Sequence, residues 1–260
     1  MDNLLLEIGA EEIPAGYIQP ALTFLSSSLL QKLMDARIEH GPARVYGTPR
    51  RLAVKVESVA RKQKSIKSEV IGPPAKVGFD ENGKPTMAAQ KFAEKVGVPV
   101  NQLAVKETAR GSYLAAEKKE RGLATQILLK EILPEVISSI PFPKKMRWAD
   151  LDVEFPRPIT SILALLGKSL VTFHFGNIKS GRYTYGHSFM APGKIKLDVA
   201  DDYLEKLRAA WVLADMAERK KMLERGIAEI AQKLGGRIPV SYTHLTLPTT
   251  IKPCRSRWSP

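Results

Sequence analysis

Residues 4–17, with the sequence LLLEIGAEEIPAGY, decide how the chain begins to fold. The apolar run from Leu4 to Ile8 predicts a buried strand, and Gly9 permits a tight turn at its end. Pro14 suits the first position of a helix, because a residue there has no helical partner for its N–H. The stretch therefore predicts a strand that turns directly into a helix.

Glu7, Glu11 and Glu12 place three carboxylates in this short stretch. Grouped carboxylates can bind a divalent metal or transfer protons, but such a site needs further ligands that converge from elsewhere in the chain. Acidic side chains also interact favourably with the positive end of a helix dipole. The second interpretation is the simpler one, and we expect neither a catalytic residue nor a metal site in this chain.

The size and composition of the chain are those of a folded, water-soluble protein. Its 260 residues suffice for one large or two ordinary domains, and 44% of them are hydrophobic while 26% are charged. No apolar run reaches the ~18 residues of a membrane span, and no secretory leader opens the sequence. Cys254 is the only cysteine, which excludes an internal disulfide or a thiolate zinc site. We expect a cytoplasmic protein without a membrane partner.

The excess of positive charge indicates the class of partner. Forty Lys and Arg against 27 Asp and Glu give a net charge of +13. Such an excess favours a polyanion, because paired cations release the counterions of a phosphate backbone. Nucleic acid is therefore a better candidate than a membrane surface. Many basic proteins bind no nucleic acid, so charge alone leaves this open.

Hydrophobic periodicity predicts an α+β fold, with mixed or antiparallel sheets and packed helices in at least two modules. Helices are expected at 14–34, 86–96, 123–140 and 216–234, and strands at 4–8, 43–46, 52–59, 103–107, 113–118 and 195–199. An exposed loop at 78–86 contains a predicted turn at Asn82-Gly83. The run Pro141-Phe142-Pro143 is the clearest local boundary, so the predicted modules are 1–140 and 141–238.

The turn at 47–51, with the sequence GTPRR, is the first candidate contact to nucleic acid. Arg50 and Arg51 stand at the entrance of a predicted strand, where their guanidinium groups can bind phosphate. Neighbouring residues of a strand point to opposite faces, so only one of the two can serve a given surface. Phosphate contact by at least one of them is therefore a hypothesis that the sequence leaves open.

A second basic cluster follows the predicted boundary. Lys144, Lys145 and Arg147 stand beside Trp148, and Arg157 lies between two prolines that hold its backbone extended. Cations beside a flat aromatic ring suit a nucleic-acid backbone and an unstacked base. They equally suit a junction at which the tryptophan is buried and the cations are solvated. Both interpretations stay open at this point.

The sequence lacks the motifs of an autonomous enzyme. His187 lies in the run GRYTYGHSF at 181–189, but no partners for catalysis occur at an interpretable spacing. No glycine-rich phosphate loop, HExxH motif or GxSxG nucleophile elbow is present. A packing role for His187 is therefore favoured, and an independent hydrolase that combines it with the three glutamates is not. The pattern is typical of a binding subunit.

The composition changes near Pro239. No acidic residue follows Glu229, and residues 239–260 show no period that continues the preceding fold. The string PVSYTHLTLPTT is similar to translated adaptor sequence. We expect residues 239–260 to be a non-native tail and leave them out of the fold prediction.

Eight runs then identify a resemblance that covers residues 3 to about 238. They are LLLEIGAEEIPAGYI, TPRRLAVKV, VIGPP, FDENGKPTMAAQKFAEKVGV, GSYL, FPKKMRW, FPRPI and TYGHSF. In this order and spacing the chain resembles the β subunit of bacterial heterotetrameric glycyl-tRNA synthetase, a class II enzyme. Family members are several hundred residues longer, so the resemblance implies an N-terminal fragment without the C-terminal anticodon-binding domain.

The resemblance implies a partner and a division of labour. In this family the α subunit carries the active site that uses ATP and Mg to join glycine to tRNA, while the β subunit supports tRNA binding and assembly. The implied partners are the α subunit and tRNA(Gly) in an α2β2 heterotetramer, and this chain itself binds no cofactor. Candidate RNA contacts are Arg50, Arg51, Lys144, Lys145, Arg147 and Arg157, and candidate subunit contacts are Glu11 and Glu12. A scaffold that only docks the α subunit, or a separate RNA-binding module, is the alternative.

The chain departs from the family pattern at two positions. Ser188 replaces the arginine that commonly follows the histidine of the family's GHRF-like run, which weakens a phosphate contact there. Ala149 stands where glycine usually follows MRW. If that position requires a positive φ, alanine restricts the backbone.

Overall fold

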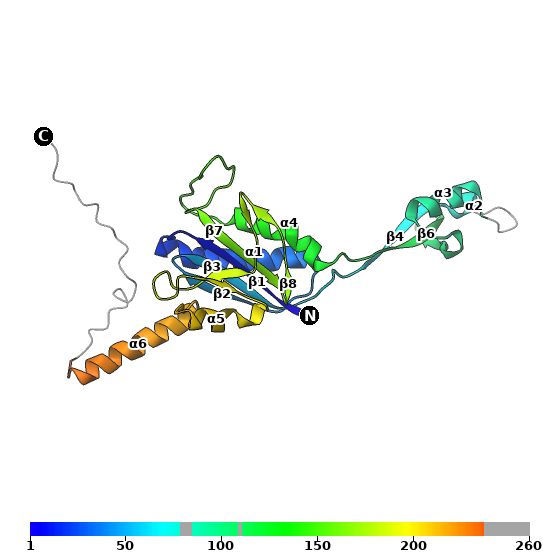
Figure 1. Cartoon of the computed structure of the whole chain (residues 1–260). Helices are drawn as coiled ribbons and strands as arrows, with labels where there is room; N and C mark the ends of the chain where they lie inside the picture. Colours follow the sequence, from blue (N-terminus) through cyan, green and yellow to red (C-terminus); the bar gives the residue numbers. More distant parts are fainter. Residues whose placement is uncertain (79–84, 109–110, 237–260) are drawn as a thin grey trace. The chain divides into compact units, whose positions relative to one another are not determined.

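The structure is a computed structural model that describes residues 1–78, 85–108 and 111–236 (Figure 1). The chain divides into two compact units: unit 1 comprises residues 1–61 and the chain from 125 onward, and unit 2 comprises residues 62–124. The predicted turn at Asn82-Gly83 and the expected tail at 239–260 lie outside the described residues. Helices and antiparallel sheets occur together, which confirms the predicted α+β class.

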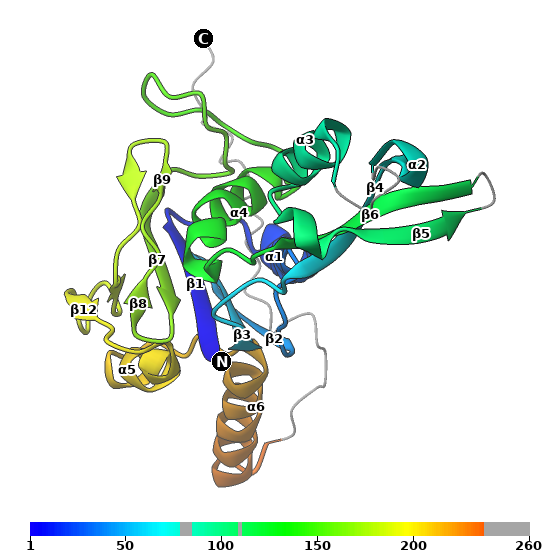
Figure 2. The same ribbon diagram turned by 90° about the vertical axis from the view of Figure 1, so that its right-hand side faces the viewer.

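Unit 1 is built on a five-stranded sheet in the order β2-β3-β1-β7-β8. The strands are β1 (Asp2–Ala10), β2 (Ala43–Thr48), β3 (Arg51–Val59), β7 (Ile159–Leu166) and β8 (Ser169–Leu170). The first strand is central and pairs antiparallel with β3 and β7, as Figure 2 shows. Its residues alternate between the two faces, so a buried run such as LLLEI serves two cores at once.

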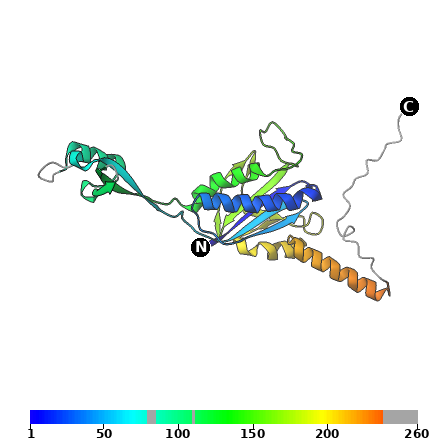
Figure 3. The same cartoon turned by 180° about the vertical axis from the view of Figure 1, so that it is seen from behind.

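One face of the sheet is covered by two helices, α1 (Ala15–Asp35) and α4 (Thr125–Ser139), which lie side by side in Figure 3. Leu4, Leu6 and Ile8 of β1 pack there in the main core. Buried residues recur along α1 at helical spacing: Ile18, Ala21, Leu22, Leu25, Leu29 and Leu33. This spacing confirms the predicted helix at 14–34 and explains why it packs on the sheet.

The opposite face of the sheet has a separate, smaller core. Leu5 of β1 packs there against Tyr203 and Leu207 of α5 (Tyr203–Ala209). Because residue 7 lies on the same face as residue 5, Glu7 is directed into this second core. The central strand therefore carries a carboxylate into an apolar layer.

The remaining elements of unit 1 follow β7 in the chain. Two short hairpins join β9 (His174–Phe175) to β10 (Ile178–Lys179) and β11 (Tyr183–Tyr185) to β12 (Lys194–Lys196). A short 3-10 turn, Ala200–Asp202, leads into α5, and α6 (Met216–Lys233) follows. Asp215 caps α6 by accepting from the N–H groups of residues 217 and 218 at 2.9 and 3.0 Å. None of the helices in the described ranges is long and apolar enough to cross a membrane.

Unit 2 has a three-stranded antiparallel sheet in the order β4-β6-β5. Its strands are β4 (Ile66–Pro74), β5 (Ala104–Thr108) and β6 (Gly111–Glu120), and its helices are α2 (Ala75–Gly78), α3 (Met87–Val96) and the 3-10 turn Val100–Gln102. Phe92 and Leu114 are the largest residues of its small core. Gly97 ends α3 with a φ of 76°, in the left-handed conformation that favours glycine.

These units differ from the predicted modules 1–140 and 141–238. The strands β1 and β7 stand on either side of the predicted boundary at Pro141, but they pair along most of their length. Residues 141–143 therefore lie within unit 1. The separate body is instead the segment 62–124, which is inserted between β3 and α4.

Candidate functional site

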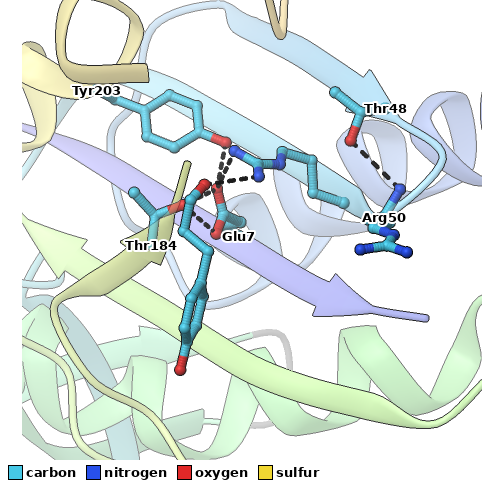
Figure 4. Close-up of polar contacts among 7 residues, drawn as sticks. Glu7, Thr48, Arg50, Thr184 and Tyr203 are labelled. Carbon is cyan, nitrogen blue, oxygen red and sulfur yellow. Dashed lines mark hydrogen bonds and ion pairs between the residues drawn. The ribbon is translucent and has the colours of Figure 1, made fainter. Parts of the chain in front are cut away.

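A buried polar network on the second face of the sheet is the most unusual feature of unit 1. Glu7, at 2% exposure, lies on β1 and accepts a hydrogen bond from the Tyr203 hydroxyl at 2.5 Å. The Thr184 hydroxyl of β11 lies 2.7 and 2.9 Å from the two carboxylate oxygens of Glu7. Figure 4 shows these three side chains converging from a strand of the sheet, a hairpin and a helix.

Arg51 of β3 completes the network. Its Nη2 donates to the Tyr185 carbonyl at 2.8 Å, and its Nη1 lies 3.9 Å from Oε2 of Glu7. The residue is only 7% exposed, and its Nε and Nη1 have no hydrogen-bond partner within the described part of the chain. The attraction within a buried ion pair offsets the free-energy cost of desolvation only when the hydrogen bonds of both groups are satisfied. The pair of Arg51 and Glu7 therefore contributes more to positioning than to stability.

Tyr203 adjusts to this environment. Burial raises the pKa of its hydroxyl well above the ordinary value, and the nearby Glu7 carboxylate raises it further. The hydroxyl therefore stays protonated and donates to Glu7 across the physiological range. Because the three partners of Glu7 come from separate elements, the network fixes β11 and α5 against the sheet.

Two adjoining cavities open beside this network. The first has a volume of about 430 Å³ and the second about 340 Å³. Both are bordered by Arg50, Arg51, Gly186 and Ser188, so they share a wall. Glu7 and Glu11 line the first cavity, while the second is lined by Glu12, His187, Trp211 and Arg219, among others.

Glu11 and Glu12 lie before the helix and do not interact with its dipole. The first turn of α1 holds no acidic residue, because the helix begins at Ala15. The N–H groups of Glu11 and Ile13 donate instead to the carbonyls of Pro158 and Pro49. The helix-start interpretation is therefore wrong for both glutamates. Glu12 instead forms an exposed ion pair with Arg50 at 3.1 Å.

The two arginines of the GTPRR turn face different surroundings, as strand alternation predicts. Arg50 is exposed at the turn, where Thr48 accepts from its backbone N–H at 3.3 Å (Figure 4). Arg51 is buried in the network. Of this pair, only Arg50 presents its side chain to a partner at the surface.

The second basic cluster is held on a looped segment, residues 141–158. Met146 and Phe155 exchange backbone hydrogen bonds of 2.9 and 3.2 Å, and Phe155 also contacts Phe142 with ring centroids 4.9 Å apart. This pairing closes the segment on itself, and the burial of Phe155 in the main core anchors it. The four cations of the cluster are all exposed: Lys144, Lys145, Arg147 and Arg157.

The side chains of this segment bear on the two earlier interpretations. Trp148 is half-buried and packs against the main core, which favours the junction over a free stacking platform. Arg147 pairs with Glu154 at 3.1 Å, and Arg157 donates to the Pro156 carbonyl at 3.0 Å. The cations are thus solvated and partly oriented by the segment itself.

Comparison with known proteins decides the family. A model described as the glycyl-tRNA synthetase beta subunit matches residues 4–247. The glycine–tRNA ligase beta subunit of Desulfatibacillum aliphaticivorans is 52% identical over 236 residues, which cover 91% of this chain and 34% of that protein. The corresponding protein of Desulforapulum autotrophicum is 51% identical over 233 residues, which cover 90% of this chain and 34% of that protein. This chain belongs to the glycyl-tRNA synthetase beta-subunit family.

The chain spans about a third of the length of the curated relatives that it matches. The relative from Myxococcus xanthus is 44% identical over 236 residues, which again cover 34% of that protein. The family match continues past residue 238, the expected end of the native sequence. Its last residues lie outside the part of the chain that the structure describes.

The two departures from the glycyl-tRNA synthetase beta-subunit pattern have structural consequences. Ala149 has a φ of 50°, the left-handed conformation in which glycine is unstrained. Ser188, at the position where the resemblance implies an arginine, borders both cavities, which Arg50 and Arg51 also line.

His187 holds a loop of the beta-subunit chain. The ring Nδ1 of His187 accepts from the backbone N–H groups of Phe189 and Met190 at 3.2 and 3.1 Å. The backbone N–H of His187 donates to the Ala210 carbonyl. The imidazole therefore holds the backbone of residues 187–190 by hydrogen bonds, although the residue itself is exposed. No group of three or more His, Cys, Asp and Glu that could hold a metal ion occurs within the described ranges.

Sequence reasoning missed two members of the network, Thr184 and Tyr203. They lie 177 and 196 residues from Glu7, and only the tertiary fold brings them together. The available signal was the position of Glu7 inside an apolar strand. A carboxylate there requires buried donors from other elements, but the sequence does not show which.

Proposed function

We propose that this chain is a part of glycine–tRNA ligase that contributes tRNA(Gly) binding and assembly with the α subunit. The observation that carries the proposal is the identity of 51–52% with proteins named glycine–tRNA ligase beta subunit, over at least 90% of the chain. The net charge of +13 supports a polyanionic substrate such as tRNA. In this proposal the reaction is ATP-dependent glycylation of tRNA in the cytoplasm.

The chemistry belongs to the partner subunit in this proposal. ATP, Mg and glycine are bound by the α subunit of an α2β2 assembly, and this chain supplies binding surface. The buried Glu7 carboxylate is occupied by two hydroxyl donors, which suits a structural group better than a general base.

The tRNA-binding surface that we propose is the 141–158 segment. It presents Lys144, Lys145, Arg147 and Arg157 to solvent on a backbone that is anchored at Phe155. Arginine and lysine that are held in this way bind phosphates without reading base sequence. Arg50 is a further candidate, although its ion pair with Glu12 must open for it to contact phosphate.

The test is charge reversal on the proposed tRNA surface. The double variant Arg147→Glu/Arg157→Glu should weaken tRNA(Gly) binding and reduce the slope of log affinity against log salt by about 1 for each phosphate that is no longer bound. Binding is measured by titration of labelled tRNA at several salt concentrations. The control Lys221→Glu/Arg225→Glu reverses two exposed cations on α6.

The control should lower affinity only through net charge and should leave a steeper salt slope than the test variant. An unchanged affinity and slope in Arg147→Glu/Arg157→Glu contradict the assignment of this surface. Stable association of the chain with the α subunit without any retention of tRNA favours the scaffold alternative instead.

A further inference from the structure

Trp211 stands at a helix end where the backbone requires a left-handed residue. Its N–H donates to the Arg208 carbonyl at 3.0 Å, and the N–H of Val212 donates to the Leu207 carbonyl at 2.9 Å. These two bonds form a Schellman motif at the end of α5, in which residue 211 has a φ of 62°. Glycine is the usual residue there, because a side chain strains the conformation.

Burial of the indole does not compensate for this strain. The Trp211 side chain is 66% exposed, so most of its apolar surface gains nothing from folding. A bulky residue in the left-handed region is a genuine outlier, and such strain concentrates at functional positions. Within the described residues, neither the backbone nor the core accounts for a tryptophan at residue 211.

Other exposed apolar side chains lie on or next to the loop that is bonded to this helix end. Tyr185, Phe189 and Met190 are 40%, 84% and 55% exposed, and they lie on or beside the 186–193 loop. The His187 N–H donates to the Ala210 carbonyl at 3.0 Å, which ties this loop to the helix end next to Trp211. We call these four residues, together with the two cavities beside Arg51, the Trp211 surface.

The charges of the Trp211 surface distinguish between possible partners. The two cavities are lined by three carboxylates, Glu7, Glu11 and Glu12, and by three guanidinium groups, Arg50, Arg51 and Arg219. A phosphate backbone favours an excess of cations over anions, and the lining of these cavities has no such excess. Exposed aromatic residues around arginines, with balanced charge, are instead typical of the central contacts of protein interfaces.

We propose that the Trp211 surface docks the α subunit, and this inference rests on the proposed function. An apolar or aromatic side chain of the partner packs against Trp211, which lines the 340 Å³ cavity, and against Phe189 on the adjoining 186–193 loop. A basic residue of the partner pairs with Glu11, the exposed carboxylate at the 430 Å³ cavity. The proposed tRNA contacts of the 141–158 segment line neither cavity, whereas Arg50 lines both and is assigned to the α-subunit surface in this inference.

The test replaces the strained tryptophan with the residue that its backbone favours. The variant Trp211→Gly should raise or preserve the melting temperature while it weakens α-subunit binding by about tenfold or more, as the loss of a central aromatic contact does. Its tRNA affinity should stay within about twofold of wild type. The purified α subunit is the titrant, and its dissociation constant is measured by calorimetry or by light scattering.

A matched control exists at the end of α1. Arg37 has a φ of 57° and occupies the same position of an equivalent motif, since Ile38 donates to the Leu33 carbonyl at 2.9 Å. Arg37→Gly should relieve similar strain without any change in α-subunit affinity. Phe189→Ser, which replaces a side chain that is 84% exposed, should weaken α-subunit binding without loss of the fold.

The outcomes separate this inference from the proposed function. Wild-type affinity for the α subunit in both Trp211→Gly and Phe189→Ser overturns the docking surface alone. Loss of tRNA binding with retained α-subunit binding in Trp211→Gly also overturns it, because the surface then serves RNA. A wild-type chain that binds neither the α subunit nor tRNA contradicts the proposed function itself.

Discussion

At the scale of single residues, the chain is organised around a buried carboxylate. Glu7 interrupts an otherwise apolar strand, and its charge is tolerated because Tyr203 and Thr184 donate to it from outside the sheet. The approach of Arg51 to 3.9 Å adds attraction without a hydrogen bond. The geometry of the surrounding cavities thus depends on hydroxyl groups that the sequence alone does not place near Glu7.

Removal of one donor should show this dependence. Tyr203→Phe leaves a buried charged acceptor with one hydroxyl fewer and should lower the free energy of unfolding by about 2 kcal/mol. Chemical denaturation monitored by circular dichroism measures the change. The control Tyr17→Phe, at a half-buried ring that contacts Phe142, should change stability by less than about 0.5 kcal/mol. Equal stability of wild type and Tyr203→Phe contradicts the role of this hydroxyl.

The same hydroxyl predicts a dependence on alkaline pH. The folded pKa of Tyr203 lies above the ordinary value of about 10, so below that pH both states hold the proton. Above it the unfolded chain loses the proton first, and stability falls as pH rises towards the folded pKa. Tyr203→Phe should therefore show a shallower loss of stability between about pH 10 and 11 than wild type.

At the scale of elements, some structure was predictable from periodicity and some was not. The helix at 14–34 was predictable, because its apolar residues recur at spacings of three and four residues. The division of β1 between two cores was not predictable, since both faces of the strand are buried and its sequence shows no alternation of apolar and polar residues. The inserted unit 2 was also missed, because proline-rich residues 141–143 gave a stronger local signal than the connections near residues 61 and 125.

The candidate site was predictable only where a local rule applied. Strand alternation separates Arg50 from Arg51, and the exposed cations of 144–157 follow from their charge. The glutamates at 11 and 12 were misplaced by the helix-start rule, because long-range backbone bonds to Pro49 and Pro158 determine that turn. Local sequence contains no information about such contacts.

The 141–158 segment allows a test of backbone strain within an element. Ala149 has a φ of 50°, so Ala149→Gly should raise the free energy of unfolding by up to about 1 kcal/mol. Thermal unfolding provides the measurement. The control Ala209→Gly, at an exposed position in α5, should instead lower it by about 0.5–1 kcal/mol. Destabilisation by Ala149→Gly comparable to the control contradicts a left-handed backbone at this position.

At the scale of the whole molecule, the two segments of unit 1 on either side of the inserted unit 2 are hydrogen-bonded to each other. The N–H of Thr125 donates to the Arg61 carbonyl at 2.9 Å, and the Thr125 hydroxyl donates to the Ala60 carbonyl at 2.5 Å. The two ends at which unit 2 is inserted are therefore adjacent. None of the described residues of unit 2 belongs to the five-stranded sheet or to its two cores.

Excision of unit 2 follows from this arrangement. Replacement of residues 63–123 with a short Gly-Ser linker should leave unit 1 folded, because the loop ends are already held together. We expect cooperative thermal unfolding and retained near-ultraviolet circular dichroism. The reciprocal fragment 62–124 has a small core and should be marginally stable at best. Non-cooperative unfolding of the excised protein contradicts an independent unit 1.

The central claim is that this chain binds tRNA and the α subunit through two different surfaces. Parallel titrations of Arg147→Glu/Arg157→Glu and Trp211→Gly with tRNA(Gly) and with the α subunit test it most directly. The predicted result is a crossed pattern, in which the first variant loses affinity for tRNA alone and the second loses affinity for the α subunit alone. If both variants keep wild-type affinity for both partners, or if each loses both, the two-surface account is contradicted.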